Sequence, residues 1–137
     1  MTNIMVVEDN TILRGLLRDW LSAELAGCRV LEAASGEEAL ERGGAIPISV
    51  ALMDIGLPGM SGLEAARILI ARDPGLRVVI LSIHDEERYR QEAAAAGVHA
   101  YVPKQNIYTG LLPVVRKFLS PDKYSTVVAD KNKRSAF

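Results

Sequence analysis

Acidic side chains follow two short apolar runs of this sequence. Glu8 and Asp9 come directly after residues 4–7, and Asp54 comes directly after residues 50–53. If both runs are strands of one parallel sheet, the three carboxylates meet at the same edge. Two like charges about 4 Å apart repel each other by about 1–4 kcal/mol at effective dielectric constants of 80 to 20. A fold keeps such a cluster where a cation fills it, and an all-oxygen site with few protein ligands suits Mg²⁺.

A hydroxyl and an ammonium group follow two further apolar runs. Ser82 comes directly after residues 78–81, and Lys104 lies two positions after residues 100–102. Beside the acidic cluster, these groups can neutralise and hydrogen-bond phosphoryl oxygens while one carboxylate acts as the nucleophile. Taken singly, the acids could cap helices and Lys104 could be a solvated surface lysine. Their coincidence at the ends of four predicted strands favours a common site.

Five apolar runs alternate with longer helical patterns. The runs are too short for helices and mostly too continuous for strands with one face in water. They cover residues 4–7, 30–33, 50–53, 78–81 and 100–102. Five strand–helix repeats with short connections predict an α/β fold, a doubly wound five-stranded parallel sheet with helices on both faces. In that fold the ligand site lies at the carboxyl ends of the strands, where the strand order reverses.

Local signals predict where the helices begin and end. The starting signals are Asn10 as a cap and two capping boxes, Ser35 with Glu38 and Ser61 with Glu64. Gly97 is the expected stop of a helix over residues 86–96. Pro113 interrupts the last helical pattern, so that helix is expected to begin near Gly110 or to kink there.

Two sets of apolar side chains predict which helix faces are buried. The first helix is expected to bury one stripe, formed by Leu13, Leu16, Leu17, Trp20, Leu21 and Leu25. The last helical pattern makes one stripe, which is formed by Ile107, Leu111, Val114, Val115 and Phe118. Leu112 and Leu119 fall outside that stripe. They are candidates for a partner or dimer patch, and scattered surface leucines explain them equally well.

The composition restricts the classes of protein to consider. The chain has 137 residues, 49% of them hydrophobic and 24% charged, which fits one globular domain with its own core. Sixteen Lys and Arg against seventeen Asp and Glu give a formal charge of −1, so no long-range field attracts nucleic acid or an anionic membrane. Cys28 is the only cysteine, and the sequence contains no apolar run long enough to span a membrane. We expect a cytoplasmic domain over residues 1–120 and a polar tail or linker over 121–137.

Four stretches together resemble the receiver domain of two-component response regulators, the CheY-like family. They are residues 5–10 (MVVEDN), 51–62 (ALMDIGLPGMSG), 79–85 (VILSIHD) and 96–104 (AGVHAYVPK). The resemblance covers roughly residues 3–120. It implies a flavodoxin-like (βα)5 fold with strand order 2-1-3-4-5. The sequence VILSIHD is most similar to that of receivers that precede a helix-turn-helix output domain. We expect no direct nucleic-acid binding by this chain.

The resemblance also implies roles for individual residues. Asp54 would accept a phosphoryl group from a sensor histidine kinase, and Ser82 and Lys104 would bind the phosphoryl oxygens. Tyr101 would be the aromatic switch, although packing in the core explains a strand tyrosine as well. The implied Mg²⁺ ligands are Glu8, Asp9, Asp54 and the carbonyl of Gly56. A phosphorylation-dependent homodimer is a possible output.

Three residues depart from the common family pattern. The acid pair is Glu8 and Asp9, so one arm of the metal site is longer. Ile83 follows the serine where many receivers carry a small residue, and Pro103 precedes Lys104 where many place a proline after it. None of these differences removes an essential group.

Two other readings remain open at this point. An aspartate-nucleophile phosphatase of the haloacid dehalogenase type needs a second acid two residues after the nucleophile, and that position is Gly56. The second open reading is an inert doubly wound interaction module. Nucleotide-binding glycine motifs do not occur, and Cys28, His84 and His99 lack the spacing of zinc ligands.

Overall fold

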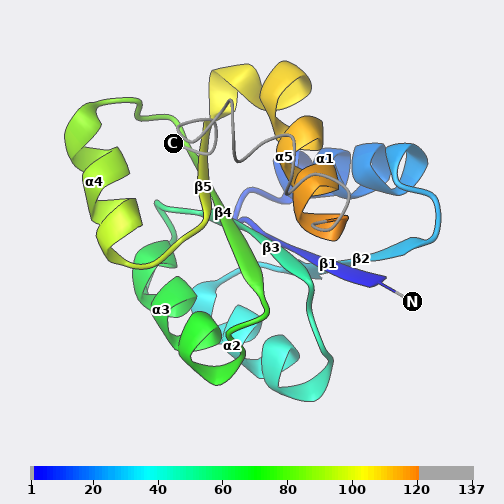
Figure 1. Ribbon diagram of the computed structural model, residues 1–137, viewed down its shortest axis with the longest axis horizontal. Helices are drawn as coiled ribbons and strands as arrows, with labels where there is room; N and C mark the ends of the chain where they lie inside the picture. Colours follow the sequence, from blue (N-terminus) through cyan, green and yellow to red (C-terminus); the bar gives the residue numbers. More distant parts are fainter. Residues whose placement is uncertain (1, 121–137) are drawn as a thin grey trace.

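The computed structural model describes residues 2–120 and contains one five-stranded parallel sheet (Figure 1). The strands are β1 (Thr2–Val7), β2 (Cys28–Ala33), β3 (Val50–Asp54), β4 (Arg77–Ser82) and β5 (Ala100–Pro103). Their order in the sheet is β2-β1-β3-β4-β5, and all four pairings are parallel. The order reverses between β1 and β3, as the doubly wound prediction requires. The predicted fold class and strand order are confirmed.

Helices cover both faces of the sheet. They are α1 (Thr11–Glu24), α2 (Gly36–Ala45), α3 (Gly62–Arg72), α4 (Glu87–Ala95) and α5 (Leu112–Leu119). Figure 1 shows α1 and α5 on one face and α2, α3 and α4 on the other. Each face has its own apolar core, because successive strand residues point to opposite sides. In β1, Met5 and Val7 pack toward α2 and α3, whereas Ile4 and Val6 pack toward α1 and α5. No helix within residues 2–120 is long and apolar enough to cross a membrane.

The residues predicted to cap helices lie at helix N-termini in the structure and accept hydrogen bonds there. The Asn10 side chain accepts a hydrogen bond from the Leu13 amide, and Ser35 and Ser61 accept from the amides three residues later. The Glu38 carboxylate accepts a hydrogen bond from the amide of Ala34, the residue before the cap, and so satisfies a further amide at the start of α2. The α4 helix ends at Ala95, and Gly97 then adopts a positive φ of 87°. A glycine takes that conformation without the steric cost that a Cβ brings.

Two stripe predictions are wrong. Leu16 is 56% exposed, because α1 turns the stripe formed by Leu17 and Leu21 toward the sheet. Leu112 is only 8% exposed and belongs to the core beside α1, so it cannot form a surface patch. Leu119 is partly buried against the same core.

The chain enters α5 through two irregular turns. A 3-10 turn (Lys104–Asn106) and a π-helical turn (Ile107–Leu111) precede α5, which begins at Leu112, two residues after the expected start. Within α5, Leu112 lies three residues before Val115, so both side chains lie on the buried face of the helix. Pro113 lies in the first turn of α5, where its missing N–H breaks no helical hydrogen bond.

A half-buried histidine, His99, lies at the β4–β5 edge of the sheet. The His99 ring Nδ1 accepts a hydrogen bond from the Val78 amide at 3.0 Å, and the His99 amide donates to the Val78 carbonyl at 2.9 Å. Burial and the nearby charge of Arg77 lower the pKa of His99 below its ordinary value. Between the folded and unfolded pKa values the unfolded chain binds the proton and the folded chain does not. The free energy of unfolding should therefore fall as the pH drops below about 6.5, and this loss should stop below the folded pKa.

Urea unfolding across this range measures the effect. The matched variant His99→Asn keeps a side-chain acceptor near the Val78 amide and cannot titrate there. Its free energy of unfolding should change less with pH than that of the wild-type chain. Equal pH slopes for the two proteins would mean that another group causes the dependence.

Candidate functional site

Three carboxylates meet at the carboxyl edge of the sheet. Glu8 follows β1, Asp54 ends β3, and one oxygen atom from each of Glu8, Asp9 and Asp54 lies within 4.8 Å of the others. Glu8 is 1% exposed and Asp54 is 7% exposed, whereas Asp9 is exposed. The strand order puts β1 next to β3, so the ends of these two strands bring the acids together.

Lys104 supplies the positive charge at this edge. Its Nζ lies 2.9 Å from Glu8 Oε1 and 3.5 Å from Asp54 Oδ1. Burial raises the pKa of Glu8 and outweighs the bonds from Lys104 and the Asn10 amide. Burial also works to lower the pKa of Lys104, but the hydrogen bond to Glu8 and the charge of Asp54 outweigh it and raise that pKa. Lys104 therefore carries its charge at neutral pH.

The loop after β3 holds the Asp54 side chain. The Gly56 amide donates a hydrogen bond to Asp54 Oδ1 at 3.1 Å. The Ile55 amide donates to the Leu81 carbonyl at 3.2 Å, which continues the β3–β4 pairing past Asp54. At the other end of the loop, Gly62 lies directly against the Asp54 backbone carbonyl. The Asp54 backbone is thus held on both sides of the residue, and the carboxylate accepts one hydrogen bond from the loop.

Ser82 and Tyr101 meet through the loop that follows β4. Ser82 is fully buried, and its Oγ accepts a hydrogen bond from the His84 amide at 3.0 Å. The Tyr101 hydroxyl donates to the His84 carbonyl at 2.8 Å, and Tyr101 as a whole is 4% exposed. The same loop residue therefore links the serine at the end of β4 to the tyrosine of β5. Ser82 pairs with Pro103 in the sheet register, so Lys104 is the next residue along that edge.

The donor set fits a hard divalent cation. All three candidate side-chain ligands are carboxylates, and their oxygen atoms are close enough to bind one ion together. Exposed Asp9 leaves the cluster open to solvent on one side. An ion with oxygen ligands that keeps several waters matches this arrangement better than an ion that prefers nitrogen or sulfur.

Two arginines near this edge have contacts that the sequence analysis missed. Arg14 donates to the Glu8 carbonyl and to Glu32, and the Arg90 guanidinium lies 4.8 Å from the centre of the Tyr101 ring. One signal for the first contact was present in the sequence. Glu32 is the one charged residue in the apolar run of residues 30–33, and a partly buried charge at such a position is expected to have a partner.

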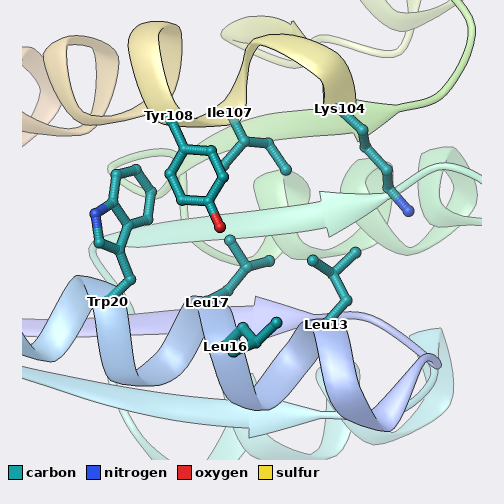
Figure 2. Close-up of a pocket in the computed structure, with 7 residues that line it drawn as sticks. All are labelled: Leu13, Leu16, Leu17, Trp20, Lys104, Ile107 and Tyr108. Atoms are coloured by element: carbon teal, nitrogen blue, oxygen red, sulfur yellow. The ribbon is translucent and has the colours of Figure 1, made fainter.

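An apolar groove lies beside Lys104. It has a volume of about 160 Å³ and is lined by Leu13, Leu16, Leu17, Trp20, Lys104, Ile107 and Tyr108. Figure 2 shows that the α1 side chains face Ile107 and Tyr108 across the groove, with Lys104 at one end. The Trp20 and Tyr108 rings meet edge to face at a centroid distance of 5.3 Å. Leu16 and Tyr108 are both exposed, so much of this lining is open to solvent.

Known proteins resemble this chain in sequence and in structure. The transcriptional activator protein ExaE of Pseudomonas putida is 37% identical over 121 residues, which cover 88% of this chain and 56% of ExaE. The chain thus spans little more than half the length of the curated relatives it matches. A LuxR-family two-component response regulator from Aurantimonas sp. SI85-9A1 superimposes with a TM-score of 0.81 at 27% identity, covering 96% of this chain and 98% of the other.

A second solved structure is the response regulator protein TrrA of Thermotoga maritima in complex with Mg²⁺ and BeF. It matches with a TM-score of 0.77 at 30% identity and covers 86% of this chain and 99% of its own. The family model of the response regulator receiver domain matches residues 4–130. This chain belongs to the response regulator receiver domain family, the signalling modules of two-component systems.

Proposed function

We propose that this chain takes a phosphoryl group onto Asp54 from a phosphohistidine of a sensor histidine kinase. The observation that carries the proposal is the position of the Asp54 carboxylate. It lies in the acidic cluster, 3.5 Å from Lys104 Nζ, and accepts a hydrogen bond from Gly56. Both of these contacts fall on Oδ1, and Oδ2 accepts no hydrogen bond from residues 2–120. We infer that Oδ2 is the nucleophilic oxygen.

The transfer step exchanges one bond to phosphorus for another. An Asp54 carboxylate oxygen attacks phosphorus, and the phosphorus–nitrogen bond of the phosphohistidine breaks. The electron pair of that bond stays on the imidazole nitrogen, which takes up a proton. Lys104 is placed to neutralise an equatorial phosphoryl oxygen, and the Ser82 hydroxyl can donate a hydrogen bond to another.

Mg²⁺ is the proposed cofactor. Glu8, Asp9 and Asp54 would hold it through carboxylate oxygens, together with the backbone carbonyl of Gly56. When bound, the ion neutralises charge on the phosphoryl oxygens and on the clustered acids. The acids of this chain are close enough for such a role, and the similar TrrA structure is described as a complex with Mg²⁺ and BeF.

Tyr101 is the proposed switch residue. Its hydroxyl is bonded to the His84 carbonyl, and the His84 amide is bonded to Ser82. A phosphoryl group that draws in Ser82 would change the position of the loop that also holds Tyr101. Two-state elements of this kind convert a local charge into a change that a partner reads.

The partners of the chain follow from this role. A sensor kinase has to present its phosphohistidine at Asp54, next to the apolar groove beside Lys104. Residues 1–120 form the receiver and act in the cytoplasm, with no membrane contact and no direct contact to nucleic acid. Residues 121–137, the predicted tail or linker, lie outside the described residues. A phosphorylation-dependent homodimer stays a prediction, and Leu112 is too buried to contribute to its surface.

Incubation of the wild-type chain with a small phosphodonor and Mg²⁺ tests the proposal. Intact-mass measurement should find one phosphoryl group on each chain, because Asp54 is the one proposed acceptor. Release of many phosphates per chain would support the phosphatase reading, for which Gly56 supplies no general acid. Absence of labelling would support the inert interaction module, and either of these results would overturn the proposal.

Mg²⁺ should stabilise the unphosphorylated chain, because it relieves repulsion among the three carboxylates. A ligand at ten times its dissociation constant contributes about 1.4 kcal/mol to the free energy of unfolding. For a domain of this size that raises the melting temperature by about 5 °C. The rise should vanish in Asp9→Ala, and it should persist in the control Glu41→Ala, which removes an exposed acid of α2. Equal Mg²⁺ responses in wild type and Asp9→Ala would place the metal elsewhere.

A further inference from the structure

Arg14 of α1 joins three elements at the edge of the metal site. Its Nη1 donates a hydrogen bond to the Glu8 backbone carbonyl at 2.7 Å, and its Nε donates to Glu32 Oε1 at 3.1 Å. Glu32 lies on β2 beside Val6 of β1 in the sheet register. The Arg14 side chain is 16% exposed, so both contacts are largely shielded from water.

The hydrogen bond from Arg14 to the Glu8 carbonyl restrains the backbone of the acidic pair, Glu8 and Asp9. The Glu8 amide makes the last bond to β2, at 3.0 Å from the Ala33 carbonyl, and the chain then leaves the sheet. A peptide group is planar, so the carbonyl oxygen of Glu8 lies in one plane with the Cα atoms of Glu8 and Asp9. Fixing that oxygen therefore orients both residues that carry proposed metal ligands.

Asp9 depends on this backbone contact more than Glu8 does. The Glu8 carboxylate is held by Lys104 and by the Asn10 amide. The Asp9 side chain is exposed and makes no hydrogen bond to another residue in the part of the chain that the structure describes. Its position is set by its backbone, and Arg14 is the side chain that holds the preceding carbonyl.

The charge of Arg14 is compensated within the same network. Glu32 accepts from Arg14 through Oε1 and from Arg18 Nη1 through Oε2 at 2.8 Å. Hydrogen bonds from Arg18 lower the pKa of Glu32, and Arg14 acts in the same direction, so Glu32 is ionised. The negative charge of Glu32 offsets the positive charge of Arg14. Arg14 therefore repels a cation at the acid pair less than an uncompensated arginine would.

We propose that Arg14 is a positioning residue for the metal site and that it sets the affinity of the acidic pair for Mg²⁺. The inference rests on the proposed function, since it concerns the same cation. The planar guanidinium reaches the Glu8 carbonyl and Glu32 with two different nitrogen atoms. A lysine carries one ammonium on a flexible stem and cannot hold both partners in that fixed geometry.

The test compares Mg²⁺ dissociation constants from isothermal titration calorimetry. Arg14→Lys keeps the positive charge, and Arg14→Met removes it. Loss of charge alone would tighten Mg²⁺ binding in Arg14→Met, whereas loss of positioning weakens binding in both variants. We expect both to bind about 10-fold more weakly, as is typical when a residue that orients metal ligands is replaced. Urea unfolding without metal confirms that each variant folds.

Arg18→Met is the matched control. It removes an equal charge from the other oxygen of Glu32 and has no contact with Glu8. Its Mg²⁺ affinity should equal or exceed that of the wild-type chain. Wild-type affinity in Arg14→Lys and Arg14→Met, with binding lost in Asp9→Ala, overturns the positioning role and leaves the metal site standing. Absence of Mg²⁺ binding by the wild-type chain overturns the metal site and this inference together.

Discussion

Asp54→Asn is expected to carry no phosphoryl group after treatment with a phosphodonor and Mg²⁺, while the wild-type chain carries one. An amide has nearly the volume of a carboxylate and keeps an oxygen acceptor for the Gly56 amide. It lacks the negative charge that makes the oxygen a nucleophile, so labelling should be lost completely. The variant also removes one of three clustered charges, and its melting temperature without metal should equal or exceed that of the wild type. Intact mass and thermal unfolding measure the two effects.

Asp85→Asn is the control for this experiment. It makes the same chemical change in an exposed acid on the loop after β4, outside the carboxylate cluster. This variant should label as fully as the wild type. Full labelling of Asp54→Asn at another residue would contradict the assignment of Asp54. Loss of labelling in a variant with a much lower melting temperature would point instead to a damaged fold.

The positions of the acids and of Lys104 could be anticipated because they depend on strand ends. In a parallel sheet the ends are set by short apolar runs, and those runs are visible in the sequence. Glu8 and Lys104 are 96 residues apart in the chain, yet Lys104 Nζ lies 2.9 Å from Glu8 Oε1 in the structure. The sequence placed both at one edge. The sequence could not show that the Lys104 ammonium lies closer to Glu8 than to Asp54, since that depends on side-chain conformation and packing.

Helix faces were predicted less well than strand ends, for a geometric reason. A face is assigned by counting residues, and a residue at the margin of the apolar face can lie either in the core or in solvent. Leu112 lies at such a margin beside Val115 and is buried, whereas Leu16 lies at the margin of the α1 face and is exposed. The Arg14 network was missed for another reason. Hydrogen bonds between α1, β2 and the end of β1 join residues with no periodic relation in the sequence.

Gly62→Ala is expected to destabilise the chain by about 3 kcal/mol or more, because a side chain at this position has no space. A Cβ built on Gly62 would lie 2.2 Å from the Asp54 carbonyl oxygen and 3.1 Å from the Cα of Ile55. Both contacts are backbone atoms, so no side-chain rotation relieves them. The α3 helix would have to move, and its Leu63, Ala65 and Ala66 are buried in the core. Urea unfolding should give a lower midpoint with an unchanged slope.

Two other glycines provide a graded control for Gly62. Gly15 lies inside α1, and the nearest atom to an added Cβ would be Arg18 Nη2 at 3.9 Å. Gly15→Ala should therefore stabilise the chain by about 0.5–1 kcal/mol. An added Cβ at Gly43 would lie 2.8 Å from Leu69 Cδ2, the movable end of a side chain, and Gly43→Ala should fall between the other two. This order follows from what each methyl group meets. If Gly62→Ala unfolds at the same urea concentration as Gly15→Ala, the contact between Gly62 and Asp54 does not limit stability. In that case the loop after β3 is free to shift, and the fixed position inferred for the Asp54 backbone is wrong as well.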